Sequence, residues 1–205
     1  MSNVFDRYVK EYDMWYNKNQ FAYLSELEVL KKVLPKKGTG LEIGVGTARF
    51  AAPLGIKFGI DTSRKMLKIA RARGIDVKLA SGENLPFNNS LFDYVIVINT
   101  LCFVKHPLKV LEEAKRVLKK TGKIIVGIID KNSFLGKTYQ KKKSLFYNKA
   151  HFLGVKEVIN LLRTVGLKRI SCYQTLFSFP DDITLIEKPR RGFGTGGFVV
   201  ISAHR

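Results

Sequence analysis

The distribution of apolar residues divides the chain into an N-terminal helical part and a longer part in which short apolar runs alternate with amphipathic segments. Between residues 5 and 34, apolar and aromatic side chains recur at helical spacing, and the polar residues 17–19 interrupt the pattern. We therefore expect two helices joined near residues 17–19. Beyond Gly38 the alternation is typical of strand–helix units around a mostly parallel sheet.

The pattern beyond residue 38 predicts seven strands and three helices. Strands are predicted at residues 41–43, 57–60, 77–80, 94–98, 123–129, 169–177 and 198–203. Helices are predicted at residues 64–73, 108–118 and 155–165, the second ended by Thr121-Gly122 and the third by Gly166. Pro53 limits residues 50–55 to a single helical turn. Residues 131–150 lack a clear period and hold a lysine run, which indicates an irregular, lid-like loop where substrate contacts are expected.

Length and composition predict a single globular domain over residues 1–205, of which 45% are hydrophobic. Within it we distinguish an N-terminal helical lid (1–35), a core (38–130), and a part with the loop, a helix and the closing strands (131–205). No stretch approaches the roughly 18 consecutive apolar residues that cross a bilayer, so a cytoplasmic protein without membrane partners is expected. Cys102 and Cys172 lie far apart without ligand-like spacing, and no metal site is indicated.

The chain is strongly basic, because 36 Lys and Arg residues against 17 Asp and Glu residues give a formal net charge of +19. Such a charge favours association with polyanions at low salt. The tightest cluster, Lys141-Lys142-Lys143, is typical of a solvated loop, and lysine-rich surfaces also occur in proteins adapted to high temperature. The charge therefore leaves nucleic acid open as a partner without specifying one.

The most informative stretch is a strand that runs into a glycine-containing turn. It reads Leu41-Glu42-Ile43-Gly44-Val45-Gly46-Thr47-Ala48-Arg49-Phe50. Gly44 and Gly46 let the backbone turn sharply and approach a ligand without a Cβ clash. Asp61 stands at the end of the next strand, 19 positions after Glu42. A carboxylate there can accept hydrogen bonds from both ribose hydroxyls of a nucleotide, and the other interpretation is that it caps the following helix.

Further motifs follow in an order that is found in one family. They are Glu83-Asn84-Leu85-Pro86-Phe87, Leu91-Phe92-Asp93-Tyr94-Val95 and Ala114-Lys115-Arg116-Val117-Leu118-Lys119-Lys120-Thr121-Gly122-Lys123. Together with the glycine turn and Gly59-Ile60-Asp61-Thr62-Ser63, they resemble the class I S-adenosylmethionine-dependent methyltransferases. The resemblance is close from Glu42 to Ile129 and holds in outline beyond. A nicotinamide dehydrogenase shares the glycine turn and the distal acid, but the later motifs and the closing pair of strands favour the methyltransferase.

The resemblance implies a fold and a cofactor. The fold is a Rossmann-like, three-layer α/β sandwich around a mostly parallel, seven-stranded sheet of order 3-2-1-4-5-7-6, with the seventh strand antiparallel. The cofactor is S-adenosylmethionine (SAM), which leaves as S-adenosylhomocysteine (SAH). By position in the family, Glu42 would lie near the methionine or ribose end of the cofactor, Gly44 and Gly46 behind it, and Asp61 at the ribose hydroxyls.

The resemblance also implies which residues would contact the adenine and which segment would lie near the methyl group. Thr62 would flank the adenine, and the turn after the third strand, here Ser81, Gly82 and Glu83, would contact the adenine edge. Asn99 opens the segment that lines the methyl-transfer centre in the family. The sequence departs from the family pattern at Ser81, which stands in place of an acidic residue, at Ala48 in place of the third glycine, and at Phe103, where many relatives have a histidine.

The acceptor is the least determined part of the prediction. An oxygen acceptor usually needs a general base, and no His or carboxylate is convincingly placed for one, so no catalytic residue is assigned and a nitrogen acceptor is slightly favoured. A small-molecule acceptor is the leading hypothesis. The alternatives are an RNA or protein methyltransferase, motivated by the charge, and a non-catalytic SAM-binding module. The N-terminal aromatic residues either cover the cofactor's sulfonium or pack the first helix against the sheet: Tyr8, Tyr12, Trp15 and Tyr16.

Overall fold

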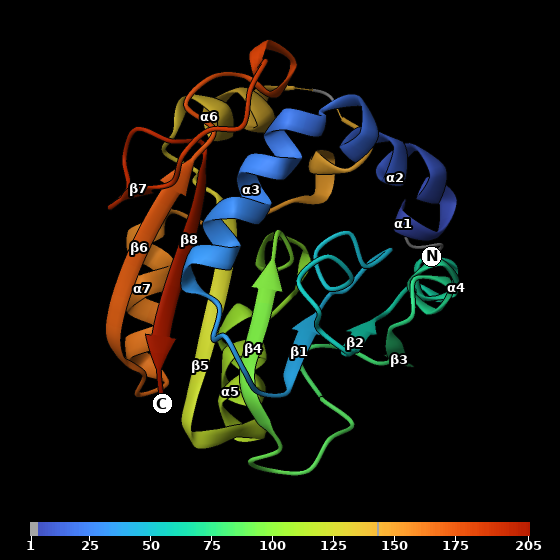
Figure 1. The fold of residues 1–205 in the computed structure, drawn as a ribbon, viewed down its shortest axis with the longest axis vertical. Helices are drawn as coiled ribbons and strands as arrows, with labels where there is room; N and C mark the ends of the chain where they lie inside the picture. Colours follow the sequence, from blue (N-terminus) through green and yellow to red (C-terminus); the bar gives the residue numbers. More distant parts are fainter. Residues whose placement is uncertain (1–3, 143) are drawn as a thin grey trace.

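The structure, a computed structural model, describes residues 4–142 and 144–205, in which eight strands form one sheet of order β3-β2-β1-β4-β5-β8-β6-β7 (Figure 1). Strands β1 to β5 are parallel neighbours, whereas β8 is antiparallel to both β5 and β6. The strands are β1 (Gly40–Ile43), β2 (Phe58–Asp61), β3 (Asp76–Leu79), β4 (Phe92–Ile98), β5 (Leu118–Ile129), β6 (Lys168–Thr175), β7 (Arg190–Arg191) and β8 (Phe198–His204).

The predicted Rossmann-like class is confirmed, and the number of strands is corrected from seven to eight. The additional strand is β7, a two-residue segment that pairs with β6 at the sheet edge through Tyr173 and Gln174. No alternation of apolar residues marks so short a strand, and it exists only because the loop before β8 passes along β6. With β7 set aside, the order of the other seven strands is the predicted one, and β8 is the antiparallel strand.

Helices cover both faces of the sheet because the strand side chains alternate between two apolar clusters. Ile96 and Ile98 belong to the cluster that holds residues of α3 and α4, whereas Val95 and Val97 pack with residues of α5 and α7. The helices are α1 (Val4–Arg7), α2 (Val9–Lys18), α3 (Gln20–Val33), α4 (Arg64–Ala72), α5 (Pro107–Val117), α6 (Phe134–Lys141) and α7 (Val155–Thr164), with short 3-10 turns η1 (Leu101–Phe103), η2 (Tyr147–Lys149) and η3 (Pro180–Asp182). None of the helices among the described residues has the length and apolar character of a membrane span.

Two local predictions need correction. Residues 131–150 are not wholly irregular: they contain α6, whose first turn is capped where the Ser133 hydroxyl accepts a hydrogen bond from the Gly136 amide at 3.0 Å, and η2. Thr121 and Gly122 do not end a helix, because α5 already ends at Val117 and β5 begins at the next residue. Residues 50–55 form hydrogen-bonded turns with no regular helix, in line with the restriction that Pro53 imposes.

Candidate functional site

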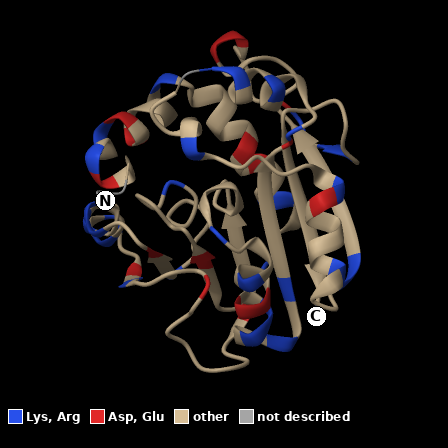
Figure 2. Cartoon of the chain, turned by 180° about the vertical axis from the view of Figure 1, so that it is seen from behind, with Lys and Arg blue, Asp and Glu red and all other residues tan. Residues whose placement is uncertain are grey.

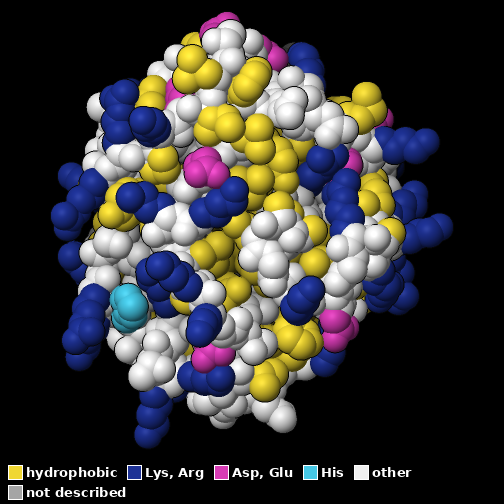
Figure 3. All heavy atoms as spheres, in the orientation of Figure 1, with side chains coloured by type: hydrophobic (Ala, Val, Ile, Leu, Met, Phe, Trp, Pro, Cys, Tyr) yellow, Lys and Arg dark blue, Asp and Glu magenta, His cyan; other side chains and the backbone are white. Residues whose placement is uncertain are grey.

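A cavity of about 460 Å³ lies at the carboxyl ends of β1 to β4, where ligands of open α/β sheets bind. Its wall includes the residues that follow these strands, and residues of α2, α3, α6 and η2 complete it. Most of the exposed lining is apolar, and Figure 3 shows hydrophobic side chains reaching the surface in the middle of the face seen in Figure 1. The turns after the strands contribute polar groups to the wall. The opposite wall, called the aromatic roof below, is formed by Phe5, Tyr12, Trp15, Tyr16, Tyr139, Phe146 and Tyr147.

The structure brings eight of the nine predicted site residues to the cavity wall: Gly44, Gly46, Asp61, Thr62, Ser81, Gly82, Glu83 and Asn99. Glu42, the ninth, does not line it. Because side chains alternate along β1, Leu41 and Ile43 pack toward α5, and Glu42 points to the opposite face beneath the turns that follow β1. Burial raises the pKa of Glu42 well above its ordinary value, although the Ala51 amide donates a hydrogen bond to it.

The turn after β1 holds its backbone in a conformation that favours glycine. Gly44 and Gly46 have φ values of 75° and 52°. A Cβ at Gly44 would lie only 2.3 Å from Thr100 Oγ1, so the Thr100 side chain after β4 packs in the space that a side chain at Gly44 would need. Ala48, at the position of the missing third glycine, also has a positive φ of 65°, which an alanine adopts at an energetic disadvantage.

Asp61 connects the glycine turn to the first turn of α4. Its Oδ2 accepts a hydrogen bond from the Gly46 amide at 2.9 Å, and its Oδ1 accepts one from the Ser63 amide at 2.8 Å. Burial raises the pKa of Asp61, and these backbone donors oppose the rise by stabilising the carboxylate. Ser63, not Asp61, caps α4, since its hydroxyl accepts a hydrogen bond from Met66 N at 3.1 Å. The carboxylate thus has further acceptor positions at the cavity wall.

The residues after β3 hold the opposite wall. Glu83 Oε1 accepts hydrogen bonds from the Lys105 and His106 amides at 3.1 and 3.0 Å, which ties this turn to the start of α5. Ser81 is exposed at the cavity wall, and its hydroxyl accepts a hydrogen bond from the Glu83 amide at 3.2 Å. Gly82 leaves no room for a side chain, because a Cβ there would lie 2.7 Å from Ile43 Cγ2.

Asp13 anchors α2 over the glycine turn. Its Oδ1 accepts hydrogen bonds from Thr47 Oγ1 at 2.6 Å and Arg49 Nε at 2.8 Å, and its Oδ2 accepts one from Arg73 at 2.8 Å. Burial tends to raise the pKa of Asp13, but the hydrogen bonds from Arg73, Arg49 and Thr47 prevail and hold it far below its ordinary value. The N-terminal helices are therefore fixed to the strand ends by a charged network.

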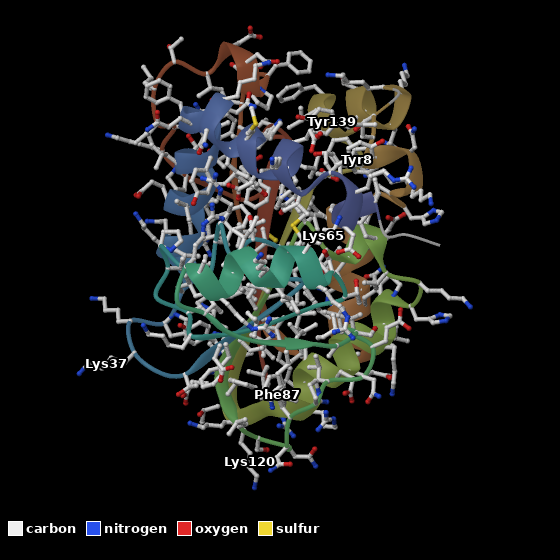
Figure 4. All side chains as sticks on the ribbon, turned by 90° about the vertical axis from the view of Figure 1, so that its right-hand side faces the viewer. Tyr8, Lys37, Lys65, Phe87, Lys120 and Tyr139 are labelled. Carbon is white, nitrogen blue, oxygen red and sulfur yellow. The ribbon has the colours of Figure 1, made fainter. Side chains whose placement is uncertain are left out.

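Aromatic rings close the cavity between the N-terminal helices and the segment after α6. The Phe5 ring stacks on Phe146 with centroids 5.6 Å apart and meets Phe103 edge-on at 5.0 Å. Tyr12, Trp15 and Tyr16 line the cavity, so these residues cover it and also pack α2 against the rest of the fold. Figure 4 shows Tyr8 and Tyr139 at one end of the molecule, above Lys65, and Lys37, Phe87 and Lys120 toward the other end.

The sequence reasoning missed Glu26, a residue of α3 that lines the cavity and is only 1% exposed. Burial raises its pKa from the ordinary 4.5 to about 8. A signal was present, because Glu26 interrupts the apolar stripe of its helix, formed by Ala22, Val29, Leu30 and Val33. Tyr139 and Tyr147 were also missed as individual residues, although both lie in the 131–150 segment in which substrate contacts were expected.

Comparison with known proteins identifies the family. A family of methyltransferase domains matches residues 41–126. A demethylmenaquinone methyltransferase of Staphylococcus saprophyticus is 30% identical over 83% of this chain and 74% of its own length. An uncharacterised protein of Methanocaldococcus jannaschii is 53% identical over 99% of both chains.

Solved structures agree with the sequence comparison. The crystal structure of a SAM-dependent methyltransferase of Thermotoga maritima, described as a possible histamine N-methyltransferase, is 46% identical to this chain with a TM-score of 0.96, and the alignment covers 100% of this chain and 99% of that one. A putative methyltransferase in complex with the Trm112 activator of Haloferax volcanii shares the fold, with a TM-score of 0.74 at 17% identity over 100% of this chain and 98% of that chain. The chain belongs to the SAM-dependent methyltransferases with the class I, Rossmann-like fold.

Proposed function

We propose that the cavity binds SAM along the carboxyl ends of β1 to β4 and encloses a small-molecule acceptor beneath the aromatic roof. The observation that carries this proposal is the continuity of the cavity, whose wall runs from the glycine turn and Asp61 to Glu26 and Tyr139. A pocket of about 460 Å³ falls in the size range of sites for small ligands. When bound, SAM supplies an electrophilic methyl group on a sulfonium.

The residues present fit this cofactor. Gly44 and Gly46 present backbone without a side chain at the cavity wall, and Asp61 offers carboxylate acceptors to the ribose hydroxyls. Thr62, Ser81, Gly82 and Glu83 are proposed to surround the adenine, and Asn99 to lie near the reacting end. Since Glu83 already accepts hydrogen bonds from the backbone amides of Lys105 and His106, we propose that Ser81 and the backbone of this turn contact the adenine edge.

The chain's own residues would act mainly by orienting the acceptor and excluding water. Tyr16 is buried and Tyr12 and Tyr147 are half-buried in the cavity wall, and burial raises the pKa of all three above the ordinary tyrosine value. An acceptor nitrogen held neutral in so dry a site is a competent nucleophile, and proximity and desolvation supply much of the acceleration. These features favour nitrogen as the acceptor atom.

A nucleic-acid acceptor is the second candidate, because the net charge is +19. Figure 2 shows Lys and Arg on elements at both ends and both flanks of the molecule, instead of along one stripe. A distributed charge of this kind favours general solubility over a defined track for a phosphate backbone. The partly open cavity with its aromatic lining therefore favours the small-molecule acceptor.

Calorimetry of SAM, SAH and NAD binding tests the proposal at two salt concentrations. We expect SAM and SAH to bind, NAD not to bind, and Asp61→Ala to weaken SAH binding by about 10- to 100-fold, the loss of a charged acceptor of about 1.5–3 kcal/mol. No SAH binding by the intact protein would overturn the proposal in favour of a non-enzymatic role. Titration of a single-stranded RNA at the same salt concentrations checks the alternative, which requires an affinity that falls steeply with salt.

A further inference from the structure

The inner end of the cavity holds a buried carboxyl group for which the described residues provide no partner. Glu26 Oε2 is buried and has no hydrogen-bond partner, and Glu26 forms no ion pair with any lysine or arginine among residues 4–142 and 144–205. A buried polar group without a partner destabilises a fold, and a charged one does so more strongly. A group retained under that penalty, in a cavity wall, marks a place where a ligand supplies the missing partner.

Tyrosines from four elements lie within electrostatic range of this carboxyl group. Five tyrosines lie within electrostatic range of Glu26, and its charge raises the pKa of each: Tyr12 and Tyr16 of α2, Tyr23 of α3, Tyr139 of α6 and Tyr147 of η2. The Tyr139 and Tyr147 rings are stacked, with centroids 4.7 Å apart and an interplanar angle of 20°. All of these except Tyr23 line the cavity together with Glu26.

The combination selects for one class of ligand group. A carboxylate neutralises a cation directly, and the electron-rich faces of aromatic rings attract cations within about 6 Å, most strongly when water is excluded. An anionic group would be repelled by the carboxylate, and a neutral hydroxyl would gain a single hydrogen bond. A flat, positively charged nitrogen group or an ammonium satisfies both the carboxylate and the rings.

We propose that Glu26, within this ring of tyrosines, binds a cationic amine group of the methyl acceptor and thereby determines its specificity. This inference rests on the proposed function, since it assumes that the acceptor occupies the part of the cavity beyond the cofactor. Glu26 is a specificity-determining residue that contacts the acceptor. The methyl group would pass to a second, neutral nucleophile of the same molecule, or to the amine itself once its proton has moved to the Glu26 carboxylate; the carbon–sulfur bond of SAM would break as the new bond forms, and SAH would leave.

Binding of such a cation has a signature that a merely structural carboxyl group lacks. Near pH 7 the free site holds Glu26 largely in its neutral form, because burial raises the pKa to about 8. The groups shown within electrostatic range of it are tyrosines from α2, α3, α6 and η2, and no ion pair joins it to a lysine or arginine among the described residues, so the arriving ammonium is what stabilises the carboxylate. The carboxyl group then releases a proton to the buffer as the complex forms.

The test is calorimetry on SAH-saturated protein at pH 7, with histamine, tyramine and 2-phenylethylamine as probes and 2-phenylethanol as the neutral counterpart. We expect at least one amine to bind, with close to one proton released in buffers of different ionisation enthalpy, and 2-phenylethanol to bind at least 10-fold more weakly. Glu26→Gln should weaken the amine by 10-fold or more and abolish proton release. Glu28→Gln, an exposed position on the same helix, serves as the matched control and should change neither.

The outcomes separate this inference from the proposed function. If the intact protein binds SAH but no amine binds better than 2-phenylethanol, or if Glu26→Gln binds the amine unchanged, the inference about Glu26 is wrong and the SAM site stands. If the intact protein fails to bind SAH, the proposed function itself fails. Unaltered SAH binding by Glu26→Gln shows that this variant is folded, so a loss of amine binding then reports on the acceptor subsite alone.

Discussion

Replacing Glu26 by glutamine should make the protein more stable at alkaline pH while it removes the proposed acceptor subsite. The carboxyl group of Glu26 is 1% exposed, and burial raises its pKa from the ordinary 4.5 to about 8. Between these two pH values the unfolded chain is ionised at this position whereas the folded chain retains the proton. The free energy of unfolding therefore falls as the pH rises from about 4.5 to about 8, and is constant with respect to this group outside that interval.

The magnitude follows from the size of the pKa change. Each unit corresponds to about 1.4 kcal/mol, so the full interval gives an upper limit of roughly 5 kcal/mol. Water penetration and local relaxation reduce such penalties, and a range of roughly 2–5 kcal/mol is reasonable. Glutamine has nearly the same shape and carries no charge, so Glu26→Gln lacks this contribution. The variant should match the wild type near pH 5 and exceed it by this amount near pH 8.5.

Urea denaturation at half-unit steps from pH 5 to 8.5 measures the free energy of unfolding of both proteins. Subtracting the wild-type value from that of Glu26→Gln cancels the titration of all other groups. Glu28→Gln is the control, because Glu28 lies on the same helix, is 45% exposed and pairs with Lys31 at 2.9 Å. Its difference from the wild type should stay within about 1 kcal/mol and be nearly independent of pH. A difference for Glu26→Gln that is equally flat would refute the claim that burial keeps this carboxyl group protonated.

Two further predictions concern the turn after β1 and its cover. Gly44→Ala places a Cβ 2.3 Å from Thr100 Oγ1 at a φ of 75°. The affinity for SAH should therefore fall at least 10-fold in calorimetry, and the melting temperature should drop. Gly55→Ala is the control: its φ is 70° but the space around it is open, so the affinity for SAH should not change. Asp13→Asn leaves Arg49 and Arg73 without a charged partner and should lower the free energy of unfolding at pH 7 by about 1–3 kcal/mol. Because the pKa of Asp13 is depressed in the folded state, the wild type should lose this advantage as the pH falls below 4, and a variant equal to the wild type at pH 7 would contradict the anchoring role.

The sequence was sufficient to predict the parts of the fold that local pattern encodes. The runs at β1, β2 and β4 are largely apolar because most of their residues are buried between the helices on the two faces of the sheet, and the glycines after β1 have positive φ values that favour glycine. For the same reason Asp61 was assigned to the cavity, since a residue at the end of a parallel strand reaches the common edge of the sheet. These are properties of single elements and of their order in the family.

Other features depend on segments that are distant in the sequence. Strand β7 has no pattern of its own and forms because the loop before β8 lies against β6, and α6 was missed because its eight residues show little periodicity beyond their serine cap. Glu42 shares a strand with the site yet does not line the cavity, since the alternation of side chains along β1 places it on the opposite face from Leu41 and Ile43, where it is buried.

The class of fold, the cofactor family and eight of the residues that line the cavity could be predicted from the sequence, because a glycine turn and a strand-end carboxylate act through short-range geometry. The surroundings of the proposed acceptor site follow from the way distant segments pack together. Glu26 lies more than a hundred positions before Tyr139 and Tyr147, and it becomes a buried carboxyl group within tyrosines when α3, α6 and η2 meet over the sheet. Its raised pKa is a property of that enclosure, which removes water from the carboxyl group, and no local sequence pattern contains it.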